Sequence, residues 1–307
     1  MTQIRTMISF VILNYNGKEL TERCIDSLTC CISGYNYEII VVDNGSNDGS
    51  VEHLKNKFPS ITIIEEGYNK FIVAYNDGVK EAKGEWVFLL NNDMVFKGNF
   101  LAPLLEYISD KDLFTVGSKM LSFEGKFEKG ANIAKFRFGY LWLKTKEVDK
   151  LTPSIYIGTH GLFRKEMFLE LRGFDIIYSP FYSEDLDLCY RAWKKGWKIF
   201  VEPSSVIYHK HMTTINKFFD RKYILRINAR NHLIFLWKNL TSKRLIIEHI
   251  LFLPFILIGA VLISKAYYLG GFLDALKLLL RGEIKGLTEN NINLKDEEIF
   301  KLFRDYW

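Results

Sequence analysis

The alternation of short apolar runs with helical patterns in the first hundred residues is the feature that most constrains the fold of this chain. Four runs rich in Val, Ile, Leu and Phe occupy 8–15, 37–44, 61–66 and 85–93. Continuous runs of this kind are typical of strands covered on both faces. The stretches between them have the length and pattern of helices, at 18–31, 50–58 and 71–83. This alternation predicts an α/β fold with a largely parallel sheet.

Polar residues follow three of the predicted strands, at the edge where parallel sheets bind ligands. They are Asn14 to Gly17, Asp43 to Asp48, and Asn91 to Asp93. The segment VVDNGSNDGS has the composition of turns and helix caps, which accounts for most of it. Asp43 is different because it stands at the strand end, where a carboxylate can accept hydrogen bonds from a nucleotide base or ribose. From these residues alone, ligand contact and turn formation remain two alternatives for Asp43.

The segment FYSEDLDLCY places Glu184, Asp185 and Asp187 among aromatic and aliphatic residues. Burying an ionised carboxylate costs several kcal/mol unless the group is paired, bound to a metal or hydrogen-bonded. These groups therefore either lie on a solvated face or line a site. Residues 184–193 have helical spacing, and the helix dipole favours carboxylates in a first turn. Capping and solvation of that helix terminus is the alternative to a role in a site.

Composition and charge exclude few classes of protein. The 307 residues are 48% hydrophobic and 25% charged, which is globular and allows one large domain with an appendage, or two domains. A net charge of +5 without a long Lys/Arg run argues only weakly for nucleic acid, a membrane surface or phosphorylated substrates, and charge alone decides between none of them. We expect no nucleic-acid partner. The four cysteines lack CxxC spacing, and the N-terminus passes straight into a strand pattern. We therefore expect a cytoplasmic protein without a signal peptide.

Five motifs occur in a characteristic order: VILNYNG, VVDNGSNDGS, FLLNNDMVF, GLFRKEMFLELRGFD and FYSEDLDLCYRAWKKGW. With them, residues 7–212 resemble the family 2 glycosyltransferases with a GT-A fold, and are most similar to the bacterial rhamnosyltransferase-like branch. The resemblance implies a Rossmann-like, mostly parallel sheet and a hexosyltransferase-type enzyme. It also implies a UDP- or dTDP-sugar donor, a divalent metal (Mg²⁺ or Mn²⁺) and an inverting transfer to an acceptor hydroxyl.

The resemblance also assigns roles to residues. It makes Asp43 a base or ribose contact, Asp93 the carboxylate on the metal side, and Asp185 the catalytic base. Glu184 is then an acceptor contact or a support for the base, and Asp187 is structural or paired with Arg191 four residues on. The other residues expected to bind the nucleotide or donor are Asn14, Asn16, Asn69, Lys70, Asn92 and Arg191.

Two departures from the family pattern bear on the donor and the metal. Asn91 stands where many relatives carry the first acid of an Asp-x-Asp motif, so we expect weaker metal binding, and a plain Asn-Asn-Asp turn is the alternative. The resemblance also implies a His that completes the metal site, and His209, which ends a strand-like run, is the expected one, with His211 as a second choice. A purely structural histidine is the alternative. The stretch 69–76 is one residue shorter than in relatives and lacks a Gly, so Lys70 would compensate near the diphosphate. Rhamnose is therefore one sugar among several.

The composition changes after residue 215, which divides the chain into a catalytic domain (1–215) and a helical extension (216–307). Residues 250–263 are uncharged and contain Pro254. A membrane-spanning helix needs about 20 apolar residues, so a segment lying at a membrane interface fits better, and a buried helix is the alternative. We expect peripheral attachment to the inner face of the cell membrane. A saccharide or lipid-linked saccharide acceptor would suit cell-surface polysaccharide or glycolipid synthesis.

Two other functions remain open from the sequence. A sugar nucleotidyltransferase would share the α/β core, but VILNYNGKEL lacks the Gly-rich loop and basic residues expected for a triphosphate. A non-catalytic nucleotide- or sugar-binding protein is favoured by Asn91 and the shortened loop. The pair Glu184–Asp185, together with His209, argues against this second alternative.

Overall fold

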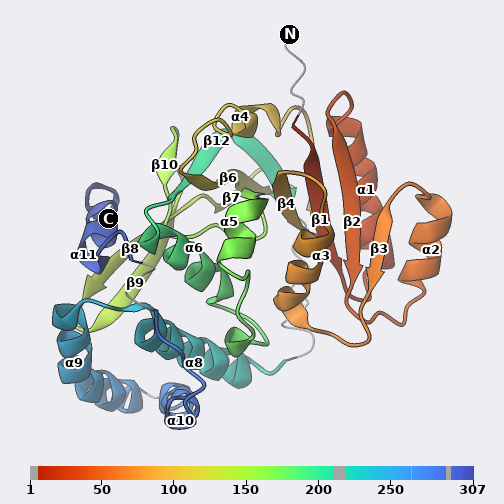
Figure 1. Cartoon of the computed structure of the whole chain (residues 1–307). Coiled ribbons are helices and arrows are strands. Elements are labelled where there is room, and N and C mark those ends of the chain that lie inside the picture. Colours follow the sequence, from red (N-terminus) through yellow and green to blue (C-terminus); the bar gives the residue numbers. More distant parts are fainter. Residues whose placement is uncertain (1–5, 210–218, 264, 288–291) are drawn as a thin grey trace.

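The first third of the chain alternates strands and helices as the apolar runs predict. The computed structural model describes residues 6–209, 219–263, 265–287 and 292–307, so His211 and the boundary near residue 215 lie outside the described residues (Figure 1). In chain order the first elements are β1 (Ile8–Asn14), α1 (Lys18–Cys31), β2 (Tyr37–Asp43), α2 (Ser50–Lys57), β3 (Thr62–Glu65), the 3₁₀ helix η1 (Phe71–Ala74), α3 (Tyr75–Glu81) and β4 (Trp86–Asn91). The expected helix over 71–83 thus begins as a 3₁₀ turn and ends slightly early.

The rest of the chain is more irregular. The middle elements are β5 (Met94–Val95), α4 (Ala102–Leu105), β6 (Leu113–Ser122), β7 (Phe127–Lys129), β8 (Ala131–Arg137), β9 (Tyr140–Lys146), β10 (Thr152–Pro153), β11 (Gly161–Arg164), α5 (Lys165–Glu170), the 3₁₀ helix η2 (Ile176–Tyr178), α6 (Glu184–Lys194) and β12 (Lys198–His209). The last elements are α8 (Arg221–Asn239), α9 (Lys243–Leu262), α10 (Tyr267–Leu280), α11 (Asp296–Lys301) and the 3₁₀ helix η4 (Arg304–Tyr306). The expected helical extension is therefore confirmed.

The main sheet has the strand order β10-β12-β6-β11-β4-β1-β2-β3. Strands β3, β2, β1 and β4 pair in parallel, as expected. The other half is mixed, because β11 runs antiparallel to both β4 and β6, whereas β6 and β12 are parallel. The short strands β5 and β7 pair with β12 and β6, and β8–β9 form a separate hairpin.

Helices cover both faces of the parallel half, which explains its continuous apolar runs. Neighbouring residues of a strand point to opposite faces. Phe10 and Ile12 of β1 accordingly join one buried cluster with residues of α1 and α2, while Val11 joins another with residues of α3, α5 and α6. A strand between two such layers has no face that could carry polar residues, so polar side chains collect at its ends.

The C-terminal helices share a core with the rest of the protein. Phe235 of α8 and Ile299 of α11 belong to the same buried cluster as Val11 of β1. At the end of α6, the fully buried Lys194 forms an ion pair with the buried Asp296 at the start of α11. Residues on both sides of position 215 therefore contribute to one hydrophobic interior.

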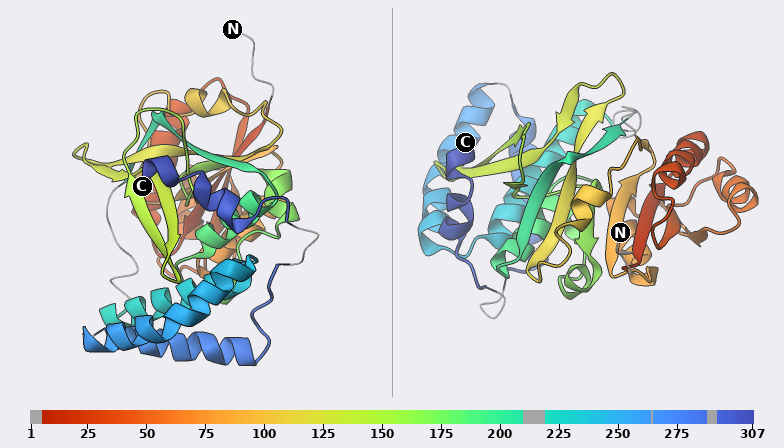
Figure 2. Two further views of the ribbon diagram at one scale, coloured as in Figure 1. Left: turned by 90° about the vertical axis from the view of Figure 1, so that its left-hand side faces the viewer. Right: turned by 90° about the horizontal axis from the view of Figure 1, so that it is seen from above.

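Helices α8, α9 and α10 lie side by side at one end of the molecule, the lower end in Figure 1 (see also Figure 2). Strand β1 starts near the N-terminus at the upper end and runs downward, and β2 runs parallel to it. The carboxyl ends of the parallel strands therefore point toward the same end of the molecule as this helical layer.

Candidate functional site

Asn14 connects the ends of the parallel strands through a network of side chains. Its Nδ2 donates to Oδ2 of Asp43 at 2.7 Å. Its Oδ1 accepts hydrogen bonds from Oγ1 of Thr21 at 2.6 Å and Nδ2 of Asn92 at 3.1 Å. Gly17 leaves the space for this approach, because a Cβ at that position would lie 2.2 Å from Nδ2 of Asn92. Three predicted donor-binding residues, Asn14, Asp43 and Asn92, are thus brought together.

The loop after β2 forms a turn, and it also borders the carboxyl ends of the parallel strands. Oδ1 of Asp43 accepts from the Ser46 backbone N–H at 2.9 Å, which is the turn expected from the sequence. Asn16 is exposed on the rim with a positive φ of 49°. Its side-chain oxygen accepts from the Asn47 N–H at 2.8 Å. The turn is therefore confirmed, and it orders Asp43 without removing it from the strand end.

The loop before α3 is organised by Asn44, a residue that the sequence did not single out. The Asn44 Nδ2 donates to Oδ1 of Asn69 at 2.7 Å, and its Oδ1 accepts from the Lys70 N–H at 2.8 Å. The Lys70 ammonium lies 2.5 Å from Glu66 and 3.1 Å from Asp77. Its charge is thus matched by two carboxylates.

Asp93 and His209 meet at the edge of the sheet, as the expected metal site requires. Nε2 of His209 lies 3.0 Å from Oδ2 of Asp93, and Nδ1 lies 2.9 Å from Oε2 of Glu128 on β7. Burial opposes the charged form of the imidazole, but the hydrogen bonds and charges of Asp93 and Glu128 outweigh it and raise the pKa of His209. A carboxylate on one ring nitrogen is the arrangement that directs the other toward a metal.

The chemistry of this pair fits a divalent cation. Oδ1 of Asp93 is buried, and no residue in the described part of the chain supplies it with a hydrogen bond. An oxygen of this kind is costly to bury unless it has a partner. Asn91 does not turn toward the pair in the same way, because its Oδ1 accepts from the Tyr75 hydroxyl at 3.0 Å. Asp93 and His209 are therefore the residues that would hold a metal.

Helix α6 places Glu184 and Asp185 at its first turn. The two residues before it, Tyr182 and Ser183, both have left-handed φ angles, of 74° and 72°. Glu184 is buried, and its Oε2 has no hydrogen-bond partner among the described residues. Asp185 is partly exposed, and its Oδ1 accepts from the Leu186 N–H at 2.7 Å. Asp185 is thus the member of the pair that a ligand can reach.

Electrostatics distinguishes the two carboxyl groups from ordinary surface acids. Burial, followed by the neighbouring charge of Asp185, raises the pKa of Glu184 to about 8. Burial also raises the pKa of Asp185, although the positive charge of Lys129 opposes this shift. Lys129 follows Glu128 on β7. Strand β7 therefore links the Asp93–His209 pair to the carboxyl pair of α6.

Asp187 and Arg191 belong to a different network. Asp187 is fully buried, and its Oδ2 accepts from Nε of Arg191 at 2.8 Å, which confirms the pairing expected at i and i+4. Its Oδ1 lies 2.9 Å from Nζ of Lys238 on α8. The other guanidinium nitrogens of Arg191 donate to the carbonyls of Leu171 and Gly173. Arg191 therefore holds the fold together and is not brought to the strand-end residues with which it was grouped.

Sequence reasoning missed Glu128, Lys129 and His160. Glu128 and Lys129 lie in FEGKFEKG, which reads as an ordinary charged hairpin. His160 precedes β11 near Asp185: a Cβ added at Gly158 would lie 3.4 Å from Oδ2 of Asp185 and 3.5 Å from Cε1 of His160. Burial lowers the pKa of His160 to about 3, so the ring is neutral. The lone His in GTHG was the one signal available for it.

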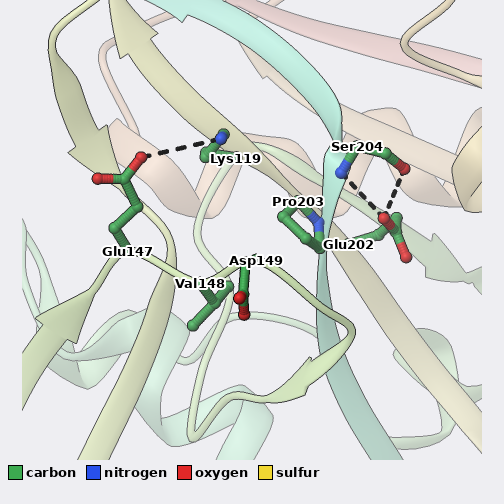
Figure 3. A pocket seen from close by; sticks show the side chains of 7 residues that line it. All are labelled: Lys119, Glu147, Val148, Asp149, Glu202, Pro203 and Ser204. Carbon is green, nitrogen blue, oxygen red and sulfur yellow. Dashed lines mark hydrogen bonds and ion pairs between the residues drawn. The ribbon is translucent and has the colours of Figure 1, made fainter.

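An open hollow of about 680 Å³ lies elsewhere, beside the irregular part of β12 (Figure 3). Its walls are formed by Lys119, Glu147, Val148, Asp149, Glu202, Pro203 and Ser204. Two of these groups are already satisfied within the wall, because Lys119 faces Glu147 at 3.8 Å and Glu202 accepts from Ser204. The predicted site residues are all absent from this wall, so the hollow is separate from the candidate site.

Comparison with known proteins identifies a family. The sequence model described as "Glycosyl transferase family 2" matches residues 9–172. An uncharacterized glycosyltransferase of Bacillus subtilis, YwdF, is 27% identical over 202 residues, 66% of this chain and 73% of that protein. A poly(ribitol-phosphate) beta-glucosyltransferase of Bacillus spizizenii is 37% identical over 92 residues, 28% of this chain but only 14% of that protein.

Solved structures with a similar fold have low sequence identity. GalNAc-T7, crystallised with UDP, GalNAc and Mn²⁺, superimposes with a TM-score of 0.61 at 16% identity, covering 76% of this chain and 48% of that one. Residues 1–349 of TarS from S. aureus give a TM-score of 0.52, also at 16% identity, covering 73% of this chain and 65% of that one. The chain thus spans only part of the length of either structure, and the likeness concerns the fold.

Proposed function

The chain belongs to glycosyl transferase family 2 and has the GT-A fold, and from this premise we propose that it is an inverting, metal-dependent glycosyltransferase. The donor is a sugar on a nucleoside diphosphate, and the acceptor is a hydroxyl group of a saccharide. One observation carries the proposal: Asp185 is partly exposed at the start of α6, and β7 connects it to the Asp93–His209 pair. Neighbouring residues of β7 thus act on both groups, Glu128 on His209 and Lys129 on Asp185.

In the proposed reaction the acceptor oxygen attacks the anomeric carbon of the sugar while the bond to the diphosphate breaks. Asp185 takes the proton of the attacking hydroxyl, and the nucleoside diphosphate leaves on the opposite side, so the anomeric configuration inverts. Because the pKa of Glu184 is raised to about 8, Glu184 retains a proton near neutral pH. A neutral Glu184 lets the negative charge of the pair reside on Asp185.

Asp93 and His209 would hold Mg²⁺ or Mn²⁺. A bound cation would neutralise the charge that develops on the diphosphate leaving group. Asn14, Asp43 and Asn92 would contact the nucleoside, because their network stands at the carboxyl ends of the parallel strands.

The rim residues Asn16, Asn69 and Lys70 would order the loops on either side of the nucleotide. In the structure the Asn16 side chain accepts the Asn47 N–H of the neighbouring loop after β2, and the Asn69 side chain accepts the Phe71 N–H of its own loop. Lys70 is paired with two acids. We therefore assign them to shaping the donor pocket. Substitution of Lys70 would test whether its ammonium also contacts the phosphates.

The donor sugar is proposed as rhamnose or another hexose on dTDP or UDP. The rhamnosyltransferase-like motifs favour the first, and the fold shared with a UDP-binding protein is compatible with the second. The product would belong to a cell-surface polysaccharide or a glycolipid, made by an enzyme attached to the inner face of the cell membrane. We therefore propose a lipid-linked saccharide as the acceptor.

The test is a screen of nucleotide-sugars for transfer and hydrolysis by mass spectrometry, followed by variants. Asp185→Asn should lower turnover by about 10²-fold or more while nucleoside-diphosphate affinity stays within about threefold, because a base acts on the acceptor proton. Asp149→Asn, an exposed acid in the hollow of Figure 3, is the matched control and should behave as the wild type. Normal turnover in Asp185→Asn would exclude it as the base. Nucleotide binding with no turnover on any donor would favour a binding protein.

A further inference from the structure

Helix α9 leaves most of its apolar side chains uncovered. Only 11% of its most apolar stretch is buried, although by length and composition the helix could cross a membrane. A helix of the protein core would be mostly buried. The exposed side chains recur at helical spacing, at Ile247, Ile250, Leu251, Phe255, Ile258, Val261 and Leu262. They therefore form one broad apolar face.

Helix α10 and the β8–β9 hairpin extend this surface. Leu269, Leu273 and Leu280 of α10 are 38%, 55% and 80% exposed, and their spacing puts them on one side of the helix. Phe138, at the hairpin turn, is 51% exposed, and its ring centroid lies 5.5 Å from that of Phe252 on α9. We call the exposed apolar residues of α9, α10 and Phe138 the apolar end face.

The first two turns of α9 are fixed to the folded protein. Nδ1 of His249 lies 2.6 Å from the Gly139 carbonyl, and its Nε2 accepts from Nε1 of Trp237 at 2.9 Å. A Cβ at Gly139 would come within 2.9 Å of the α9 backbone, so hairpin and helix are in close contact. The stretch 250–263, which carries most of the exposed apolar side chains of α9, is about 21 Å long at 1.5 Å per residue. The hydrocarbon core of a bilayer is about 30 Å thick, so this part is too short to cross it.

Basic groups surround the apolar end face. The exposed cations at its edges are Lys243, Arg244, Lys265, Lys277 and Arg281. Two of these cations face acids, Arg244 at 3.5 Å from Glu297 and Arg281 at 3.8 Å from Glu283. Of the other acids nearby, Asp274 is held by Arg226 at 2.6 Å, and Glu248 accepts from the Gly139 N–H at 3.2 Å. An apolar surface with a positive rim is complementary to an anionic lipid leaflet rather than to a neutral surface.

We propose that the apolar end face seats in the interfacial layer of one leaflet of an anionic bilayer, with α9 and α10 lying in the plane of the membrane. The carboxyl ends of the parallel strands point to this same end of the molecule (Figure 1). A lipid-linked saccharide would therefore approach Asp185 from the membrane side. This last point rests on the proposed sugar transfer, whereas the binding to lipid does not.

The test uses the full chain in flotation with vesicles of phosphatidylcholine, with and without phosphatidylglycerol. Anionic vesicles should bind the protein at least about tenfold more strongly, because each basic residue near such a surface adds about 1 kcal/mol. The double variant Leu251→Glu/Phe255→Glu should weaken binding by at least about tenfold, since charges oppose insertion. Leu169→Glu on α5, also an exposed apolar residue, is the control and should float as the wild type. An alkaline wash should release the bound protein.

Four results would overturn the proposal. They are wild-type protein that floats with neither vesicle, equal binding to both vesicles, a double variant that floats like the wild type, and wild-type protein that resists the alkaline wash as a spanning protein does. Light scattering adds a check, because a dimer dissociated by the double variant would show that a second copy covers the face. Nucleotide binding, measured separately in solution, distinguishes these failures from a failure of the proposed sugar transfer.

Discussion

Glu128 determines how the imidazole of His209 is presented. It holds Nδ1 of the ring at 2.9 Å, which leaves Nε2 facing Asp93. Removing an acceptor of this kind commonly weakens metal affinity by about 10–100-fold, because the ring loses its orientation. We expect Glu128→Ala to reduce Mn²⁺ affinity by that amount, with Glu128→Gln in between, as measured by electron paramagnetic resonance of free Mn²⁺.

Glu124→Gln, in the same β6–β7 turn, is the control for this prediction, because Glu124 is exposed and bonded to Ser122. Its Mn²⁺ affinity should match the wild type. Wild-type affinity in Glu128→Ala would mean that Glu128 has no positioning role.

Glu184 should make stability depend on pH in an unusual direction. Burial raises its pKa from the ordinary value of 4.5 to about 8, so folding favours its protonated form. This contribution is fully present below the unfolded pKa and is lost as pH rises through the folded pKa. A Gln at this position does not titrate, so Glu184→Gln does not lose this contribution as pH rises. The free energy of unfolding of the variant should therefore increase relative to the wild type between about pH 5 and pH 9.

Urea denaturation at several pH values measures this gain. The exposed Glu52→Gln of α2 is the control and should show a constant difference from the wild type. A constant difference for Glu184→Gln as well would mean that Glu184 titrates like a surface acid.

Some members of the site could be predicted from the sequence, and others could not. Asp93 and His209 were selected through the resemblance to a known family, and the end of a strand-like run only favoured His209 over His211. Glu128 could not be predicted from the sequence, because its contact with His209 depends on the pairing of β6 with both β7 and β12. Arg191 was grouped with the wrong neighbours for the same reason: spacing predicted its bond to Asp187 but not its carbonyl partners.

Asp187 connects helix α6 to helix α8. This carboxylate is buried against Arg191, Lys238 and Asn239, and these partners lower its pKa to about 2 although burial opposes the shift. Asp187→Asn should lower the free energy of unfolding by about 3–5 kcal/mol at neutral pH, because it leaves buried cations unmatched. The contribution of Asp187 is present above its unfolded pKa near 3.8 and is lost as pH falls through about 2.

Denaturation at pH 7 measures this cost, and the double variant Asp187→Asn/Lys238→Met should recover part of it because one unmatched cation is removed. Strictly additive losses would mean that the two groups do not interact.

At the level of elements, the sequence was informative where the strands are long and covered on both faces. Strands β1, β2 and β4 were predicted correctly because each is an unbroken apolar run. The middle of the chain gives no such signal, because its strands are short, antiparallel or partly exposed, as in β9, where Trp142 and Leu143 face solvent. Strand β12 is further interrupted by a register shift between Glu202 and Val206. The order of these strands in the sheet depends on pairings between distant segments, which the local sequence periodicity does not reveal.

The whole chain should unfold as one unit, because its last helix completes the core. Asp296 accepts the Tyr190 hydroxyl at 2.5 Å and the Ser242 N–H at 2.6 Å, in addition to pairing with Lys194. Asp296→Ala should therefore cost about 3–5 kcal/mol, and removal of residues 245–307 should yield insoluble protein. Fluorescence and circular dichroism should report the same transition in the intact chain.

Lys301→Ala at the exposed end of α11 is the control and should leave the transition in place. A soluble truncated protein that still binds nucleotide would show that residues 1–244 fold alone, as the division at residue 215 suggests.

The common orientation of the helical layer and the strand ends has a kinetic consequence. A catalyst seated on a bilayer meets a lipid-borne acceptor by lateral diffusion, so the relevant concentration is a mole fraction in the surface rather than a molarity in the bulk. Adding inert lipid at a fixed amount of acceptor would then slow the docked enzyme by surface dilution. Adding buffer would leave the rate per docked molecule unchanged.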